Sequence, residues 1–246
     1  MALSQPMKVK PVHFLPLVLV LILWVFYGNF EVSWSMANKI AALAGLALAA
    51  ITFLLGPLAR FWPSLFAKYI THRKYLGLFA FALIVLHAVL SIVFYYDLSV
   101  EKMLYENPKV LGFYAASVAF LIFLVMSVTS TQKACDMLGY RTWKMVQMCG
   151  YVALLLSLAH FYILETRGDR GFVVRPLGYA VFALGVLALA AKVVAVARHR
   201  AKTAYEQHVR HDAAHEHAVS GKEEVLKAAE EEEGGKYCPP NSGFGG

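Results

Sequence analysis

Two aliphatic stretches, LIVLH at residues 83–87 and LSLAH at residues 156–160, each end in a histidine. Both stretches lie inside longer apolar runs, far from the charged segments of the chain. An ionisable side chain is costly inside a bilayer and usually faces a partner or a cofactor within the helix bundle. His87 and His160 therefore indicate an integral membrane protein with a polar site in its interior.

The composition favours the same class. The 246 residues are 59% hydrophobic and 16% charged, with a mean hydropathy of +0.56, whereas soluble domains are about 45–50% apolar and about 25% charged. The net charge of +7 could suggest a nucleic-acid partner. We predict no such partner, because the basic residues lie mostly at the ends of apolar segments, where they determine topology. The three cysteines form no C-x-x-C pair and indicate neither a disulfide framework nor a zinc site.

Six apolar stretches approach or exceed the roughly 20 residues that a membrane-spanning helix needs. They are residues 12–30, 36–59, 75–96, 109–130, 144–165 and 174–197. We read the first as a retained signal anchor, because it is long and lacks a small-residue cleavage site. The predicted fold is therefore an all-α bundle of six transmembrane helices.

The basic residues of the connections predict the orientation of this bundle. Lysine and arginine predominate at the N-terminus, in the second and fourth connections and after the last span, which makes both termini cytoplasmic by the positive-inside rule. The fifth connection, with Arg167, Arg170 and Arg175, is the exception. We predict two domains: a membrane domain over residues 1–197 and a polar cytoplasmic tail over 198–246, partly helical and then irregular.

The depths of the two histidines can be compared along their spans. At 1.5 Å per residue, His87 lies about 18 Å along the third span and His160 roughly 24 Å along the fifth. Both spans run outward, so both histidines fall in the outer half of a hydrocarbon core about 30 Å thick. Two imidazoles on different helices at similar depth suit axial ligation of one heme iron. A single such histidine could instead be a helix–helix hydrogen bonder. A proton pathway would need deep carboxylates or lysines, and the spans contain none near their centres.

Several short strings resemble the ferric-reductase-like transmembrane domain family. In order along the chain they are GPLAR at 56–60, RKYLGL at 73–78, His87, TSTQ at 129–132, LG at 138–139, Trp143, Tyr151 and His160. Within that family the sequence looks most like MsrQ, the heme-binding membrane subunit of the periplasmic methionine-sulfoxide reductase system. The resemblance implies a bundle that carries b-type heme and moves electrons across a bacterial cytoplasmic membrane.

The resemblance also bears on the number of hemes. Relatives with two stacked hemes have two histidines, 13–14 residues apart, on each ligand helix. Here the corresponding positions hold Arg73, 14 residues before His87, and Gln147, 13 residues before His160. The MsrQ group is similar at Arg73 but usually has histidine where this chain has Gln147. Neither arginine nor glutamine is an ordinary heme ligand, so we expect one heme b, with His87 and His160 as the iron ligands. Arg73 and Gln147 remain weaker candidates for cofactor contact.

One heme in the outer half leaves the source of its electrons open. A quinol or a flavin such as FMN could bind partway across the membrane, and Arg73, Lys74 and Arg141 form a basic rim where an anionic phosphate could sit. The alternative is that these three residues only fix the topology and bind lipid head groups. The expected function is an electron-transfer subunit of an oxidoreductase system, without acid–base catalytic residues, that contacts membrane lipids and a redox protein on the outer face. The alternatives are an auxiliary heme-binding or structural subunit of a larger respiratory or photosynthetic complex, and a heme-free scaffold.

Overall fold

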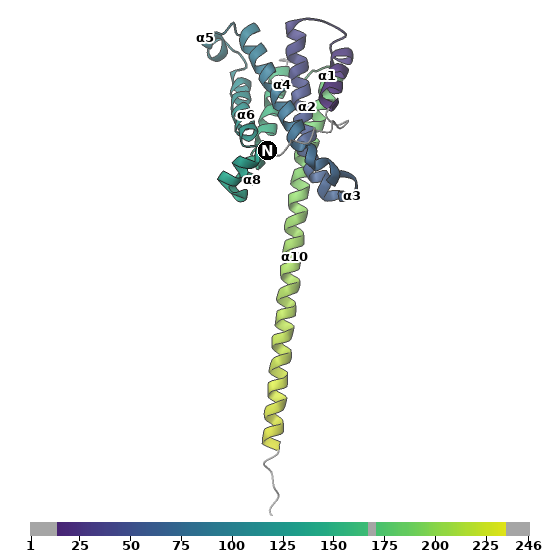
Figure 1. Cartoon of the computed structure of the whole chain (residues 1–246). Helices are drawn as coiled ribbons and strands as arrows, with labels where there is room; N and C mark the ends of the chain where they lie inside the picture. Colours follow the sequence, from purple (N-terminus) through teal and green to yellow (C-terminus); the bar gives the residue numbers. More distant parts are fainter. Residues whose placement is uncertain (1–13, 167–170, 235–246) are drawn as a thin grey trace, which may run out of the picture. The chain divides into compact units, whose positions relative to one another are not determined.

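The computed structural model describes residues 14–166 and 171–234, with side chains described up to 208 and at 210 (Figure 1). The described residues form helices and one isolated β-bridge between Thr166 and Phe172. In chain order the helical elements are α1 (Leu15–Phe26), α2 (Trp34–Phe61), α3 (Pro63–Phe66), the 3-10 helix η2 (Ala67–His72), α4 (Arg73–Phe94), α5 (Val100–Leu104), α6 (Val110–Val128), α7 (Gln132–Leu138), α8 (Tyr140–Met148), α9 (Gly150–Glu165) and α10 (Pro176–Gly234).

Five of the predicted spans correspond to helices long and apolar enough to cross a membrane. They are Trp34–Phe61, Pro63–Phe94, Val110–Val128, Tyr140–Glu165 and Pro176–His208. The first predicted span differs, because within the described residues it contains only the 12-residue helix α1. Twelve residues extend about 18 Å, well short of a hydrocarbon core about 30 Å thick. The protein is thus an all-α membrane protein with five candidate spanning helices, and the sixth span and the orientation of the termini stay predictions.

Helix α2 is the centre of the bundle. In its most apolar stretch 78% of the residues are buried, against 17–22% in the other four candidate spans. Its middle is rich in alanine, and Gly45 lies so close to α4 that an added Cβ would be 3.0 Å from Ile84 Cγ1 and 3.3 Å from the Ala80 carbonyl. Small residues let membrane helices approach closely. The principal pairs are consequently α2 with α4 and, on the other side, α6 with α9.

A proline inside α2 creates a bonding requirement that other helices meet. Pro57 has no backbone N–H, so the Phe53 carbonyl four residues earlier loses its helical partner. The Tyr151 hydroxyl of α9 donates to that carbonyl at 3.0 Å. Arg73 Nε of α4 donates to the neighbouring Thr52 carbonyl at 3.0 Å. Two strings that carry the family resemblance therefore meet at this proline.

Within the candidate span Tyr140–Glu165, which contains the fifth predicted span, 144–165, one residue interrupts the regular helix. Helix α8 ends at Met148 and α9 begins at Gly150, with Cys149 between them. Gly150 is packed so tightly that an added Cβ would lie 2.3 Å from Phe53 Cζ and 2.6 Å from Met126 Cε. Close packing of α9 against α2 and α6 accompanies the break.

The chain divides into two compact units, residues 1–195 and 196–246. The first contains the bundle, including the first part of α10, where Val181 and Ala188 are buried. In the second unit α10 continues to Gly234 through the segment predicted as a helix-favouring tail. Residues 235–246, predicted to be irregular, and Arg167 and Arg170 of the fifth connection lie outside the described residues.

Candidate functional site

The structure brings His87 of α4 and His160 of α9 together. Their ring centroids are 6.3 Å apart and the ring planes are inclined by 64°. Both side chains are partly buried. The pair lies towards the end of the bundle where α2 begins and α4 ends, which we call the histidine end.

The His87 ring is held by a residue that sequence analysis did not single out. Its Nδ1 lies 2.7 Å from Asn38 Oδ1 and 3.3 Å from the Asn38 backbone carbonyl. Asn38 is only 5% exposed, and its Nδ2 donates to Ser91 Oγ at 3.0 Å. Because both oxygens near Nδ1 only accept, Nδ1 carries the proton and donates. The Nε2 atom of His87 then keeps a free lone pair.

His160 has the same tautomer for a simpler reason. Its Nδ1 lies 2.8 Å from the Gly112 carbonyl of α6, which can only accept. A Cβ added to Gly112 would lie 3.1 Å from Ile163 Cγ2, so the glycine allows α6 and α9 to approach closely here. The Nε2 atom of His160 also keeps its lone pair. The site therefore offers two neutral imidazoles, each fixed through Nδ1 and each with Nε2 available to a metal.

Asn38 could have been noticed in the sequence, and Gly112 could not. An asparagine within the apolar stretch 36–59 is a polar residue near a span, the same signal that selected the histidines. The contribution of Gly112 is a backbone carbonyl, which every residue has. Its role depends on the pairing of helices whose contacting residues are 48 apart in sequence.

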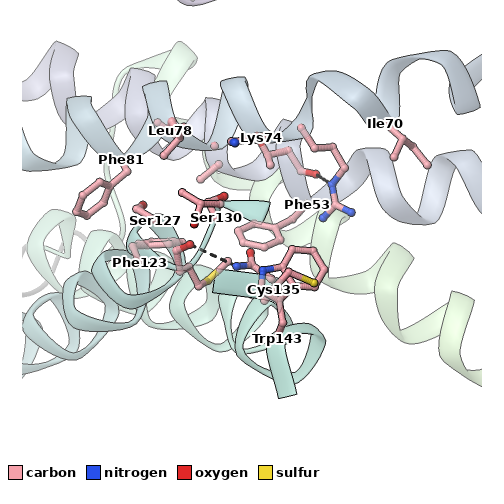
Figure 2. A pocket seen from close by; sticks show the side chains of 18 of the residues that line it. Phe53, Ile70, Lys74, Leu78, Phe81, Phe123, Ser127, Ser130, Cys135 and Trp143 are labelled. Carbon is pink, nitrogen blue, oxygen red and sulfur yellow. Dashed lines mark hydrogen bonds between the residues drawn. The ribbon is translucent and has the colours of Figure 1, made fainter. Parts of the chain in front are cut away.

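A second feature is a cavity of about 640 Å³ in the bundle (Figure 2). Phe81 and Phe123 lie at one end of it, and Ile70 lies at the other. Ile84 also lines the cavity, and it precedes His87 by three residues, or about 4.5 Å along the helix. Arg73, Lys74 and Gln147, three of the predicted candidates, are among the lining residues, whereas Arg141 is not.

Arg73 and Gln147, which line this cavity, both donate hydrogen bonds to backbone carbonyls. Arg73 Nε is engaged by Thr52, as described above. Gln147 Nε2 donates to the Met126 carbonyl at 3.3 Å and approaches Thr129 Oγ1 at 3.4 Å. Trp143 Nε1 donates to the Thr129 carbonyl at 2.9 Å. Gln147 and Trp143 thus satisfy carbonyl groups at the end of α6, which a helix terminus leaves without partners.

Comparison with known proteins gives two findings. Residues 41–158 match the family described as ferric reductase like transmembrane component. The chain is also 31% identical over 124 residues to the magnetosome protein MamZ of Magnetospirillum gryphiswaldense, an alignment that covers 49% of this chain and 18% of the relative. The chain therefore spans less than a fifth of that relative's length. The matched segment includes His87, Gly112 and the residues that line the cavity, and it ends two residues before His160. Residues 41–158, a little under half of the chain, are thus similar to the ferric reductase like transmembrane component family.

Proposed function

We propose that the protein is a membrane electron-transfer protein that carries one b-type heme between His87 and His160. The separation of the two rings carries this proposal. A ligating imidazole nitrogen lies about 2 Å from its metal and the ring centre lies roughly 1.2 Å beyond it, so two opposed axial imidazoles place their centroids roughly 6–6.5 Å apart. The separation in this protein is 6.3 Å. The separation of the two rings therefore fits two imidazoles that would hold one heme iron between them.

The protein groups around the histidines have definable tasks. A bound heme supplies one-electron chemistry, and the chain supplies position and electrostatics. The Nδ1 donors to Asn38 and to the Gly112 carbonyl hold each ring in one orientation and increase the basicity of Nε2. Leu90 and Leu158 are buried nearby along the same two helices and keep the surroundings apolar. More basic ligands lower the reduction potential, whereas apolar surroundings favour the less charged, reduced heme and raise it.

The cavity is the place where we expect electrons to enter. It extends from Lys74, near the start of α4, to Ile84, within one helical turn of His87. Aromatic side chains and two cations line it, which suits a planar redox carrier such as a quinol or a flavin. In this proposal the acceptor is a protein on the outer face of a bacterial cytoplasmic membrane, as in the MsrQ group, with both termini on the inner side.

One observation favours a second candidate, an auxiliary subunit of a larger respiratory or photosynthetic complex. Helix α10 continues to Gly234, 59 residues in all, whereas about 20 suffice to cross a membrane. A polar helix of that length beyond a span offers surface to partner proteins. Copurification with other subunits under mild detergent would favour this candidate over the first.

The test is heme content. We expect the purified protein to give b-type bands in a reduced-minus-oxidised spectrum and about one heme per chain in a pyridine hemochrome assay. His87→Ala and His160→Ala should each abolish the bands, because one axial ligand is lost. His199→Ala, at an exposed position in α10, is the matched control and should keep them. Bands that persist in both ligand variants would refute the proposal.

A further inference from the structure

Four basic side chains converge at the end of the bundle opposite the histidines. Arg60 of α2, Arg73 of α4 and Lys192 of α10 gather near Tyr151 of α9. Lys144 of α8, whose Nζ lies 5.5 Å from the centre of the Tyr140 ring, is close enough to Lys192 for their charges to interact. We call these four cations the basic cluster. The start of α4 lies 14 residues before His87, or about 21 Å along the helix. The basic cluster is therefore separate from the histidine site.

Several contacts bring these residues together. Lys192 Nζ lies 4.9 Å above the centre of the Tyr151 ring and 3.3 Å from Met148 Sδ. The Arg73 guanidinium passes Gly56, where an added Cβ would lie 3.4 Å from Arg73 Nη1 and 3.7 Å from the Tyr151 hydroxyl. Arg60 and Arg73 both interact electrostatically with Tyr151, and Lys192 interacts with Arg60, Arg73 and Lys144.

The cluster has no carboxylate counter-ion in the part of the chain that the structure describes. The ion pairs there are Lys102 with Asp97 and Lys202 with Glu206, and neither involves the cluster. Lys192 sits within an apolar span and is partly buried. Like charges held close together beside apolar surface repel one another. An anion placed among them would relieve that repulsion.

The surface around the cluster indicates which anion. Val152 and Leu155 of α9 and Val193 of α10 are each more than half exposed on the helices that carry Tyr151 and Lys192. Such apolar surface on a membrane protein faces acyl chains. A ligand that combines a phosphate with acyl chains matches both features, whereas a free phosphate matches only the first. Basic sites between membrane helices are known to take acidic lipid head groups.

We propose that the basic cluster binds the phosphate of an anionic phospholipid, whose head group bridges α2, α8 and α10. The lipid thereby neutralises charges contributed by helices that are distant in sequence. Arg73 contributes charge, but it also holds Thr52, so the test uses the other three positions. The proposal does not depend on heme binding at His87 and His160.

Native mass spectrometry of the full chain, released from maltoside micelles doped with one lipid at a time, tests this proposal. We expect phosphatidylglycerol to bind at least tenfold more tightly than phosphatidylcholine. At about 1 kcal/mol per basic residue near a membrane surface, Lys192→Gln, Lys144→Gln and Arg60→Gln should each weaken phosphatidylglycerol binding about fivefold. Lys133→Gln, an exposed lysine of α7 outside the cluster, is the matched control and should bind like the unaltered protein.

Three outcomes would overturn the proposal: equal affinity for the two lipids, unchanged binding in Lys144→Gln and Lys192→Gln, or equal thermal stabilisation by inorganic phosphate without lipid. The last would assign the cluster to a soluble anion. Lys144 is exposed, so its variant reports on charge with little risk to folding. The hemochrome assay on the same variants should still give one heme per chain, and that measurement separates a failure of this proposal from a failure of the proposed function.

Discussion

The two ends of the bundle share helices α2, α4 and α9, but their polar groups are satisfied in opposite ways. At the histidine end, the Nδ1 atom of each imidazole has a hydrogen-bond partner. Asn38 fixes the His87 ring and the Gly112 carbonyl fixes the His160 ring. At the other end four cations gather, and neither ion pair found among the described residues involves any of them. The polar groups of the two imidazoles have partners within the chain, except for the two Nε2 lone pairs. The second end requires charge from outside. The difference shows two ways in which a membrane protein can select a ligand. One site offers free lone pairs that can bind a metal, and the other offers positive charges that can bind an anion.

The largest effect that would sharpen this comparison is expected from Gly150→Ala. The added Cβ would lie 2.3 Å from Phe53 Cζ and 2.5 Å from Phe53 Cε1, and an aromatic ring in the packed core cannot yield easily. Overpacking of this kind costs about 1–3 kcal/mol. Thermal denaturation in detergent should show a clear loss of stability. Gly77→Ala, whose Cβ would be at an ordinary 3.6 Å from Thr52 Cγ2, is the control and should melt close to the unaltered protein.

The second-largest effect is expected from Asn38→Leu, which changes only the histidine end. The substitution removes the side-chain acceptor of His87 Nδ1, and loss of such an outer partner typically lowers metal affinity about 10–100-fold. We expect the variant to lose more of its heme during purification. We also expect a more positive reduction potential, measured by redox titration of the b-type band. Ser91→Ala removes only the group that supports Asn38 and should give a smaller change of the same sign. An unchanged potential in Asn38→Leu would show that the amide does not act on the ligand.

Tyr151→Phe tests the proline of α2. It leaves the Phe53 carbonyl without its donor, at a cost of about 1–3 kcal/mol for an unsatisfied buried group. In a Pro57→Ala background the alanine N–H can bond that carbonyl, so the same Tyr151→Phe change should cost less. A double-mutant cycle in thermal or denaturant unfolding measures the difference. Equal costs in both backgrounds would mean that Tyr151 does not serve the carbonyl that Pro57 frees.

The smallest effect is expected from Gln147→Ala. Gln147 donates to the Met126 carbonyl at the end of α6, so its loss should lower stability by about 0.5–1.5 kcal/mol. Heme stoichiometry should stay at one per chain, because the residue is not a ligand in our proposal. A hemochrome assay checks this directly, and a fall in heme content with His160 intact would show that Gln147 contributes to heme binding.

The sequence predicted best what depends on composition. The limits of α2, α4 and α6 lie within two residues of the predicted spans, because apolar length decides a span. Helix α9 shares the predicted end at 165 but begins six residues later than predicted. His87 and His160 were identifiable because an ionisable residue among aliphatic ones is costly. The predicted first span was longer than α1, since hydropathy does not show where a helix stops.

What the sequence did not predict depends on the register between helices. The partnership of His87 with Asn38 joins residues 49 apart, and that of Tyr151 with Phe53 joins residues 98 apart. The expected rim of Arg73, Lys74 and Arg141 assumed that residues near the same membrane face would meet. In the structure Arg73 and Lys74 line the cavity and Arg141 does not. The Arg73 guanidinium also lies near Tyr151.

The proline of α2 also has a consequence for the order in which the chain is made. During synthesis α2 emerges with the Phe53 carbonyl unpaired, and its donor, Tyr151, is added 98 residues later. An unpaired carbonyl is expensive in lipid. Helix α2 therefore reaches its final hydrogen bonding only when α9 has been inserted beside it, and the central helix of the bundle is among the first to be made and among the last to be completed.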